Sequence, residues 1–166
     1  MNEFHSGFVV LAGRPNVGKS TLLNALVGHK VSIVTPRPQT TRHRLIGLTN
    51  LPDAQIAFVD TPGLHLGPRR GLNRAMNRTA AAALGGCDLV LLLLEALKWT
   101  EEDDLALARV REAGGPVMAV VNKIDRVRPR ERLLPYLAQL AVRHAFAEIV
   151  PISAQKHDNL SELTRL

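Results

Sequence analysis

One octet near the N-terminus constrains the fold of this chain more than any other feature. The run Gly13-Arg14-Pro15-Asn16-Val17-Gly18-Lys19-Ser20 follows an apolar stretch at 7–12 and precedes an amphipathic helical pattern at 19–27. A glycine-rich loop between a strand and a helix lets backbone N–H groups and the positive end of the helix dipole point at phosphate oxygens. The order strand, loop, helix therefore predicts an α/β fold with a phosphate-binding loop.

The residue types of this loop fit phosphate chemistry. Lys19 supplies a point charge for the β- and γ-phosphates, and the hydroxyl of Ser20 can bind Mg²⁺. For the side chain of Arg14, a solvated position is favoured over a phosphate contact. The predicted phosphate-binding residues of the loop are Gly13, Arg14, Pro15, Asn16, Val17, Gly18, Lys19, Ser20 and Thr21.

Strand and helix patterns alternate along the rest of the chain. The near-continuous apolar runs at 88–94 and 116–121 indicate strands buried on both faces of a parallel sheet. Further strands are expected over 7–12, 44–49, 55–60 and 149–152, and helices over 19–27, about 70–84, about 101–113, about 130–144 and from Asn159, with Glu162 as its capping partner. This pattern predicts an α/β, doubly wound, six-stranded, mostly parallel sheet with one antiparallel strand.

Composition limits the classes of protein that fit. The 166 residues suit one domain, and the apolar runs fall far short of the ~20 residues that span a bilayer. The single cysteine, Cys87, excludes an internal disulfide and is expected to be buried. The first 87 residues hold ten Lys or Arg against three Asp or Glu. This asymmetry predicts a polyanionic ligand, either a nucleoside triphosphate alone or a nucleic acid as well.

Two further segments would complete the phosphate site. Asp60 ends a strand and is placed to hold Mg²⁺ through water, while Gly63 lets a backbone N–H approach the γ-phosphate. One hydroxyl of the pair Thr40 and Thr41 could also reach the metal, and the pattern alone leaves the choice between them open. The candidate Mg²⁺ ligands are Ser20, Thr41 and Asp60, and the candidate switch and catalytic residues are Thr40, Thr41, Asp60, Gly63 and Leu64.

A base site is predicted where Asn122-Lys123-Ile124-Asp125 follows a buried strand. The carboxylate of Asp125 can accept hydrogen bonds from N1–H and the 2-amino group of guanine, and adenine has no donor at either place. The backbone N–H of Ala154 is expected to reach guanine O6. Groups left unpaired by the wrong base can reject it by about 10⁴. The predicted guanine-binding residues are Asn122, Lys123, Asp125, Ser153, Ala154 and Gln155.

With these motifs in order, the chain resembles the translation-factor-related P-loop GTPases, and most closely the Era-type members of the TrmE-Era-EngA-like branch. The nucleotide motifs carry the resemblance together with the stretches Gln-Thr-Thr-Arg-His-Arg at 39–44, Asp-Thr-Pro-Gly-Leu-His at 60–65 and Asn-Arg-Ala-Met-Asn at 73–77. It implies GTP and GDP as ligands, Mg²⁺ as cofactor, and a slow GTPase switch. It also implies a role in small-subunit assembly, with 16S rRNA and the 30S subunit as partners.

The resemblance also sets expectations for the whole chain. Residues 1–166 would form one GTP-binding domain that ends inside its last helix, without the C-terminal KH domain that holds RNA in this family. RNA binding therefore carries over only weakly. The chain would be a cytoplasmic monomer, with a peripheral contact to the inner membrane as a further expectation.

Two residues bear on the rate of hydrolysis. Leu64 stands where many regulatory GTPases place a water-orienting Gln, so a rate of about 10⁻⁴ to 10⁻² s⁻¹ is expected. In relatives of this family an Asn at the position of Asn16 binds K⁺, and a simple loop brace is the equal alternative. Other functions remain open: an ATPase or nucleotide kinase, a nucleotide-dependent RNA-binding or ribosome-binding module with little hydrolysis, or a related GTPase of tRNA modification or large-subunit assembly.

Two basic runs complete the sequence. Arg70, Arg74 and Arg78 share one face of the helix expected at 70–84, where a solvated face is favoured over a contact with RNA or a partner domain. The second run, at 126–132, is expected to face solvent.

Overall fold

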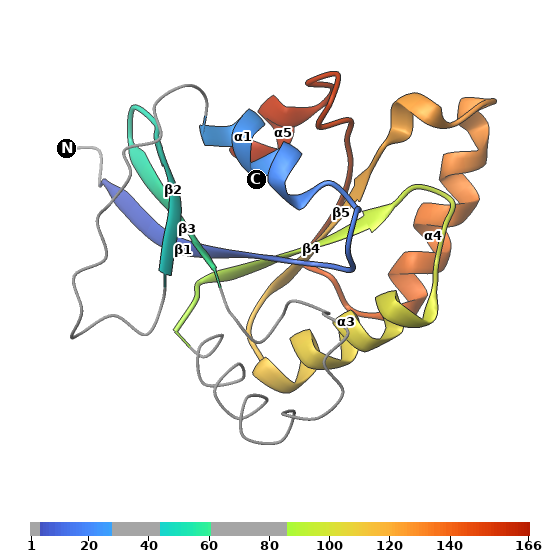
Figure 1. Cartoon of the computed structure of the whole chain (residues 1–166), viewed down its shortest axis with the longest axis horizontal. Coiled ribbons are helices and arrows are strands. Elements are labelled where there is room, and N and C mark those ends of the chain that lie inside the picture. Colours follow the sequence, from blue (N-terminus) through green and yellow to red (C-terminus); the bar gives the residue numbers. More distant parts are fainter. Residues whose placement is uncertain (1–3, 28–43, 61–85) are drawn as a thin grey trace.

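The computed structural model describes residues 4–27, 44–60 and 86–166 (Figure 1). A six-stranded sheet runs through them in the order β2-β3-β1-β4-β5-β6. The strands are β1 (His5–Ala12), β2 (Arg44–Asn50), β3 (Ala54–Asp60), β4 (Leu89–Glu95), β5 (Val117–Asn122) and β6 (Glu148–Pro151). The helix expected at 70–84 with its three arginines, and the candidate residues Thr40, Thr41, Gly63 and Leu64, lie outside the described residues.

The pairing of the strands confirms the predicted fold class. β2 and β3 are antiparallel, whereas β1 pairs in parallel with both β3 and β4, and β5 pairs in parallel with both β4 and β6. Each strand lies within two residues of the range expected from sequence. The carboxyl ends of β1, β4 and β5 therefore meet at one edge of the sheet, where ligands bind in open α/β sheets.

Helices cover both faces of the sheet, and this explains why the central strands are apolar throughout. In Figure 1, α1 (Lys19–Val27) and α5 (Leu160–Arg165) lie together on one face, while α3 (Glu101–Ala113) and α4 (Leu133–Arg143) lie on the other. Along β4, Leu92 and Leu94 pack with the α3–α4 side, and Leu91 and Leu93 with the α1–α5 side. Each fully buried leucine contributes about 1.5–3 kcal/mol.

The helix ends follow the sequence in part. α1 and α3 have the expected bounds, whereas α4 begins at Leu133 because Arg130–Arg132 form a 3-10 turn. The expected cap of α5 is wrong. Asn159 has φ 61° and donates its side-chain amide to the carbonyl of Pro151, and Glu162 pairs with Arg165 instead of capping the helix.

Two further observations concern exposure. Cys87, which was expected to be buried, is only partly buried against the core on the α3–α4 side. The second basic run faces solvent as expected, with Arg126, Arg128, Arg130 and Arg132 all exposed. Within the part of the chain that the structure describes, every helix is too short or too polar to cross a membrane.

Candidate nucleotide site

The glycine-rich loop closes between the end of β1 at Ala12 and the start of α1 at Lys19. Gly13 has φ 142°, and a Cβ on it would lie 2.6 Å from the carbonyl oxygen of Leu93. Gly18 has φ 106°, and a Cβ there would collide with the side-chain amide of Asn122. Both positions therefore require glycine. Each has a positive φ, and at each the end of a neighbouring strand lies too close to leave room for a Cβ.

The ammonium of Lys19 lies over this loop. Its Nζ donates hydrogen bonds of 2.8 Å to the carbonyl oxygens of both Gly13 and Arg14. Burial lowers the pKa of Lys19 below its ordinary value, and the positive charge of Arg14 lowers it further. A cation whose hydrogen bonds, among the described residues, all go to carbonyls of a glycine-rich loop is well placed to meet an anion.

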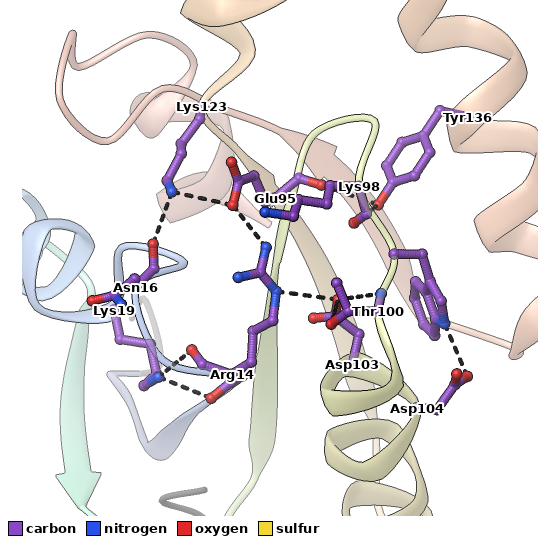
Figure 2. A network of polar contacts seen from close by, with 12 residues as sticks. Arg14, Asn16, Lys19, Glu95, Lys98, Thr100, Asp103, Asp104, Lys123 and Tyr136 are labelled. Atoms are coloured by element: carbon purple, nitrogen blue, oxygen red, sulfur yellow. Dashed lines mark hydrogen bonds and ion pairs between the residues drawn. The ribbon is translucent and has the colours of Figure 1, made fainter. Parts of the chain in front are cut away.

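The side chain of Arg14 corrects an expectation from sequence, because it is buried rather than solvated. It is 7% exposed, donates from Nη2 to Glu95 at 2.7 Å and from Nε to Asp103 at 3.2 Å (Figure 2). Burial opposes the charge, but the hydrogen bond that Arg14 donates to Glu95 and the charge of Asp103 raise the pKa of Arg14 overall. The guanidinium thus ties the loop to the end of β4 and to α3.

Asn122 joins three segments on the other side of the site. It is 3% exposed, and its Nδ2 donates to the carbonyl of Val17 in the loop at 2.8 Å. Its Oδ1 accepts hydrogen bonds from the backbone N–H groups of Lys123, at 2.8 Å, and Ala154, at 3.0 Å. The amide of Asn122 and the N–H of Ala154 are therefore used within the protein in this structure.

Asp125 is held by a serine from the last loop. Ser153 is fully buried, and its hydroxyl donates to Asp125 Oδ1 at 2.6 Å while accepting from the N–H of Lys156 at 3.1 Å. One carboxylate oxygen is thereby fixed. Gln155, from the same loop, is exposed beside it.

Lys123 reaches back across the site to the phosphate loop. Its backbone is left-handed, with φ 69°, and its Nζ donates to the carbonyl of Asn16 at 2.8 Å. The same Nζ lies 3.3 Å from Glu95 Oε2. Asn16 itself is exposed and left-handed, with φ 64°.

The phosphate loop and the segments that follow β5 and β6 line one cavity of about 550 Å³. Its lining residues come from the glycine-rich loop with the start of α1, and from the segments after β5 and β6: Asn16, Gly18, Lys19, Ser20, Thr21, Asn122, Lys123, Asp125, Arg126 and Gln155. The structure thus brings most predicted phosphate-binding and guanine-binding residues to a common space. Val17 is buried in the core, Pro15 is exposed, and the side chain of Asp60 lies outside the described part.

Sequence reasoning missed the acidic residues around Arg14. Glu95 ends a strand that is otherwise entirely apolar, and a charge in that position is a signal that could have been used. Asp103 stands three residues after Thr100 in a capping box. Helix capping already explains an acidic residue at this position, so the sequence gives no sign of its contact with Arg14. Only the fold brings these residues to the loop.

The doubly wound sheet, the glycine-rich loop that opens a helix, and the shared cavity define a P-loop nucleotide-binding domain. A family model described as "50S ribosome-binding GTPase" matches residues 8–123. The chain belongs to this GTPase family.

Within this family, the chain is similar to curated proteins named GTPase Era. The chain is 56% identical to GTPase Era of Stenotrophomonas maltophilia over 161 residues, which is 97% of this chain and 54% of that protein. It is 44% identical to GTPase Era of Actinobacillus pleuropneumoniae over 162 residues, covering 98% of this chain and 53% of that protein. The chain spans about half the length of the curated relatives it matches.

Solved structures agree with this similarity. Era in complex with MgGDPNP and nucleotides 1506–1542 of 16S ribosomal RNA superimposes with a TM-score of 0.78 at 39% identity, over 98% of this chain and 56% of that one. An Aquifex aeolicus Era variant bound to GDP·AlF4⁻ gives a TM-score of 0.76 at 39% identity, over 96% and 55%. The G domain of the T. maritima FeoB iron transporter gives 0.69 at 25% identity, over 97% and 96%.

Proposed function

We propose that this chain binds GTP and GDP with Mg²⁺ and hydrolyses GTP slowly, as a molecular switch whose G domain is formed by residues 1–166. One observation carries the proposal: the phosphate loop and the Asn-Lys-x-Asp segment line the same cavity of about 550 Å³. A volume of this size is in the range of small-molecule sites. A nucleotide placed in it would have its phosphates at one end and its base at the other.

At the phosphate end, the loop from Gly13 to Lys19 would offer backbone N–H groups to the β-phosphate. The ammonium of Lys19 would exchange its two loop carbonyls for phosphate oxygens, which removes the burial cost of an unneutralised charge. Ser20 lines the cavity and would bind Mg²⁺ together with Thr41 and Asp60. When bound, Mg²⁺ neutralises charge on the β- and γ-phosphates.

At the base end, Asp125 would select guanine. Ser153 already fixes one carboxylate oxygen by a 2.6 Å hydrogen bond, so little side-chain entropy remains to be lost when the base binds. Asn122 would act mainly by bracing Val17 and Ala154, since its amide atoms contact both. Lys123 and Gln155 line the remainder of the base end.

Competition binding tests this assignment. A fluorescent GDP analogue should be displaced by GDP and GTP, whereas ADP and ATP at equal concentration should leave it bound. Asp125→Asn should shift the preference from guanine to xanthine nucleotides, because the amide donates where the carboxylate accepts. Displacement by ATP as effective as that by GTP would refute guanine selectivity.

The hydrolytic step rests on two proposals. Leu64 cannot orient water, so single-turnover rates of about 10⁻⁴ to 10⁻² s⁻¹ are expected. Asn16 is exposed and is among the residues that line the cavity, which supports a K⁺ ion near the phosphates. KCl should then accelerate hydrolysis over NaCl at matched ionic strength, and equal rates would exclude the K⁺ role. Binding without measurable single-turnover hydrolysis would favour a pure binding module.

The biological role is proposed from similarity to Era, for which a complex with 16S ribosomal RNA is known. We place the chain in small-subunit assembly, with 16S rRNA and the 30S subunit as partners. Co-sedimentation with separated 30S and 50S subunits in GDP and in a non-hydrolysable GTP analogue tests this placement. Nucleotide-dependent binding to 50S subunits alone would move the role to large-subunit assembly.

We also propose a cytoplasmic monomer with a peripheral contact to the inner membrane. Size-exclusion chromatography and binding to lipid vesicles test the two parts separately.

A further inference from the structure

We infer that Glu95 is a positioning residue that couples the phosphate loop to the guanine-binding segment, so that guanine selectivity depends on it. The inference deepens the proposed function and rests on it. Glu95 lines neither end of the cavity; it acts through Arg14 on one side and Lys123 on the other (Figure 2).

The contacts of Glu95 join the ends of three neighbouring strands. Its Oε2 accepts from Arg14 Nη2 at 2.7 Å and lies 3.3 Å from Lys123 Nζ. Arg14 belongs to the loop after β1, Glu95 ends β4, and Lys123 follows β5. One carboxylate oxygen therefore contacts both segments, in addition to the direct hydrogen bonds from Asn122 and Lys123 to the phosphate loop.

The backbone of Glu95 is itself held in place, which makes its side chain a rigid link. Glu95 pairs with Asn122 across the β4–β5 ladder, and the next N–H, of Ala96, donates to the carbonyl of Asn122 at 2.9 Å. The hydroxyl of Tyr136, from α4, donates to the carbonyls of Glu95 and Lys98, each at 3.2 Å. Because its backbone is held, the carboxylate of Glu95 couples the position of Arg14 to that of Lys123.

Charge explains why a carboxylate is required at this position. Arg14 and Lys123 both point at it, and Asp103 neutralises Arg14 only at Nε. Although partial burial opposes it, hydrogen bonds from Arg14 and Lys123 hold the pKa of Glu95 below its ordinary value. Without this charge, Lys123 keeps the carbonyl of Asn16 as its described contact, and the two cations lose the carboxylate that they share.

The consequence for function concerns Asp125. Lys123 turns the chain in a left-handed conformation two residues before Asp125, and its anchored side chain holds that turn. Without Glu95 the ammonium keeps only one of its two described partners, the carbonyl of Asn16, so the turn is held less firmly. The carboxylate of Asp125, which Ser153 fixes at one oxygen, is then placed less precisely relative to the phosphates. Phosphate affinity and base discrimination should therefore fall together.

The test compares GDP with inosine diphosphate, which lacks the 2-amino group that Asp125 would bind. For Glu95→Gln we expect about tenfold weaker GDP binding, as for loss of one member of a largely desolvated charge pair. The GDP preference over inosine diphosphate should fall several-fold as well. Glu102→Gln, on the exposed side of α3, removes a similar charge and should change neither value.

A purely structural role for Glu95 would lower the melting temperature and leave the ratio of the two affinities unchanged; that result overturns the inference. Should Glu95→Gln fold poorly, Glu95→Asp keeps the charge but withdraws the carboxylate from the 3.3 Å contact with Lys123. It should still lower the ratio, and an unchanged ratio would count against the coupling equally.

A double-mutant cycle between Glu95→Gln and Lys123→Met isolates the link. The two effects on the affinity ratio should be far from additive, because both remove the same contact. Additive effects would overturn the inference. If the unsubstituted chain itself fails to prefer GDP over ADP, the proposed function fails, whatever the variants do.

Discussion

At the scale of single residues, the site is built on close approaches that only certain side chains permit. Asn122 lies against Gly18 so closely that a Cβ on the glycine would strike its amide. The amide in turn holds the carbonyl of Val17. The glycine of the loop and the first residue of the base segment therefore depend on each other, although 104 positions separate them in sequence.

This dependence predicts that Gly18→Ala damages the protein by more than backbone strain. A positive φ costs a non-glycine residue about 1–3 kcal/mol. Gly115 also has a positive φ, 90°, but a Cβ there meets no atom of the described residues within 4 Å, so Gly115→Ala measures the strain alone. Urea unfolding should show a loss for Gly18→Ala clearly larger than for Gly115→Ala, with GDP binding abolished in the first and kept in the second. Equal losses would show that the contact with Asn122 relaxes freely.

At the scale of elements, sequence predicts the regular parts and misses the contacts between them. The octet and the helical pattern behind it place α1 correctly from Lys19 to Val27, because local periodicity and a phosphate-loop motif determine both ends. The burial of Arg14 has no such local signal. Its partners, Glu95 and Asp103, lie 81 and 89 positions away and come close only when β1 and β4 pair.

At the start of α5, a local sequence rule predicts a helix cap, but the side chain of Asn159 makes a contact with another element instead. Asn159 and Glu162 have the spacing of a capping pair. In the structure the amide of Asn159 instead binds the carbonyl of Pro151 at the end of β6. Turn contacts of this kind leave no periodic signal, so the sequence alone favours the helix cap.

Helix α3 contacts the phosphate loop through Asp103, and this contact allows a prediction about stability. Asp103 is fully buried, receives hydrogen bonds from Thr100 and lies 3.2 Å from Arg14 Nε. Asp103→Ala should cost about 3–5 kcal/mol of unfolding free energy, because it leaves a buried guanidinium partly unpaired. Glu102→Ala removes a charge from the same first turn, with the same dipole effect, but from an exposed position. Chemical denaturation of both variants checks the difference, and similar losses would show that the pair with Arg14 contributes little.

At the scale of the whole molecule, the same strands carry the hydrophobic cores on both faces of the sheet and the residues of the site. The two faces of β4 and β5 pack against different pairs of helices, and the ends of the same strands carry Glu95 and Asn122. The strands that the helices cover on both faces therefore also position two residues of the site. At the site, this connection includes the ion pairs of Arg14 and Lys123 with Glu95. Because these pairs need the charged carboxylate, their contribution to stability depends on pH.

The pH dependence of stability follows from the direction of one pKa shift. Because the pKa of Glu95 is lower in the folded chain than in the unfolded one, its contribution is complete above the ordinary glutamate value of about 4.3. It declines as the pH falls through the lowered folded-state value, where the carboxylate takes up a proton and both ion pairs are lost. The difference in unfolding free energy between the unsubstituted chain and Glu95→Gln should thus be constant from pH 7 to about 5 and shrink below about pH 4. Urea unfolding at stepped pH measures it, with Glu102→Gln correcting for the change in net charge. A difference that persists undiminished at the lowest pH where the chain still folds would mean that the side chain of Glu95 stabilises the protein by packing, and that its charge is not what joins the two halves of the site.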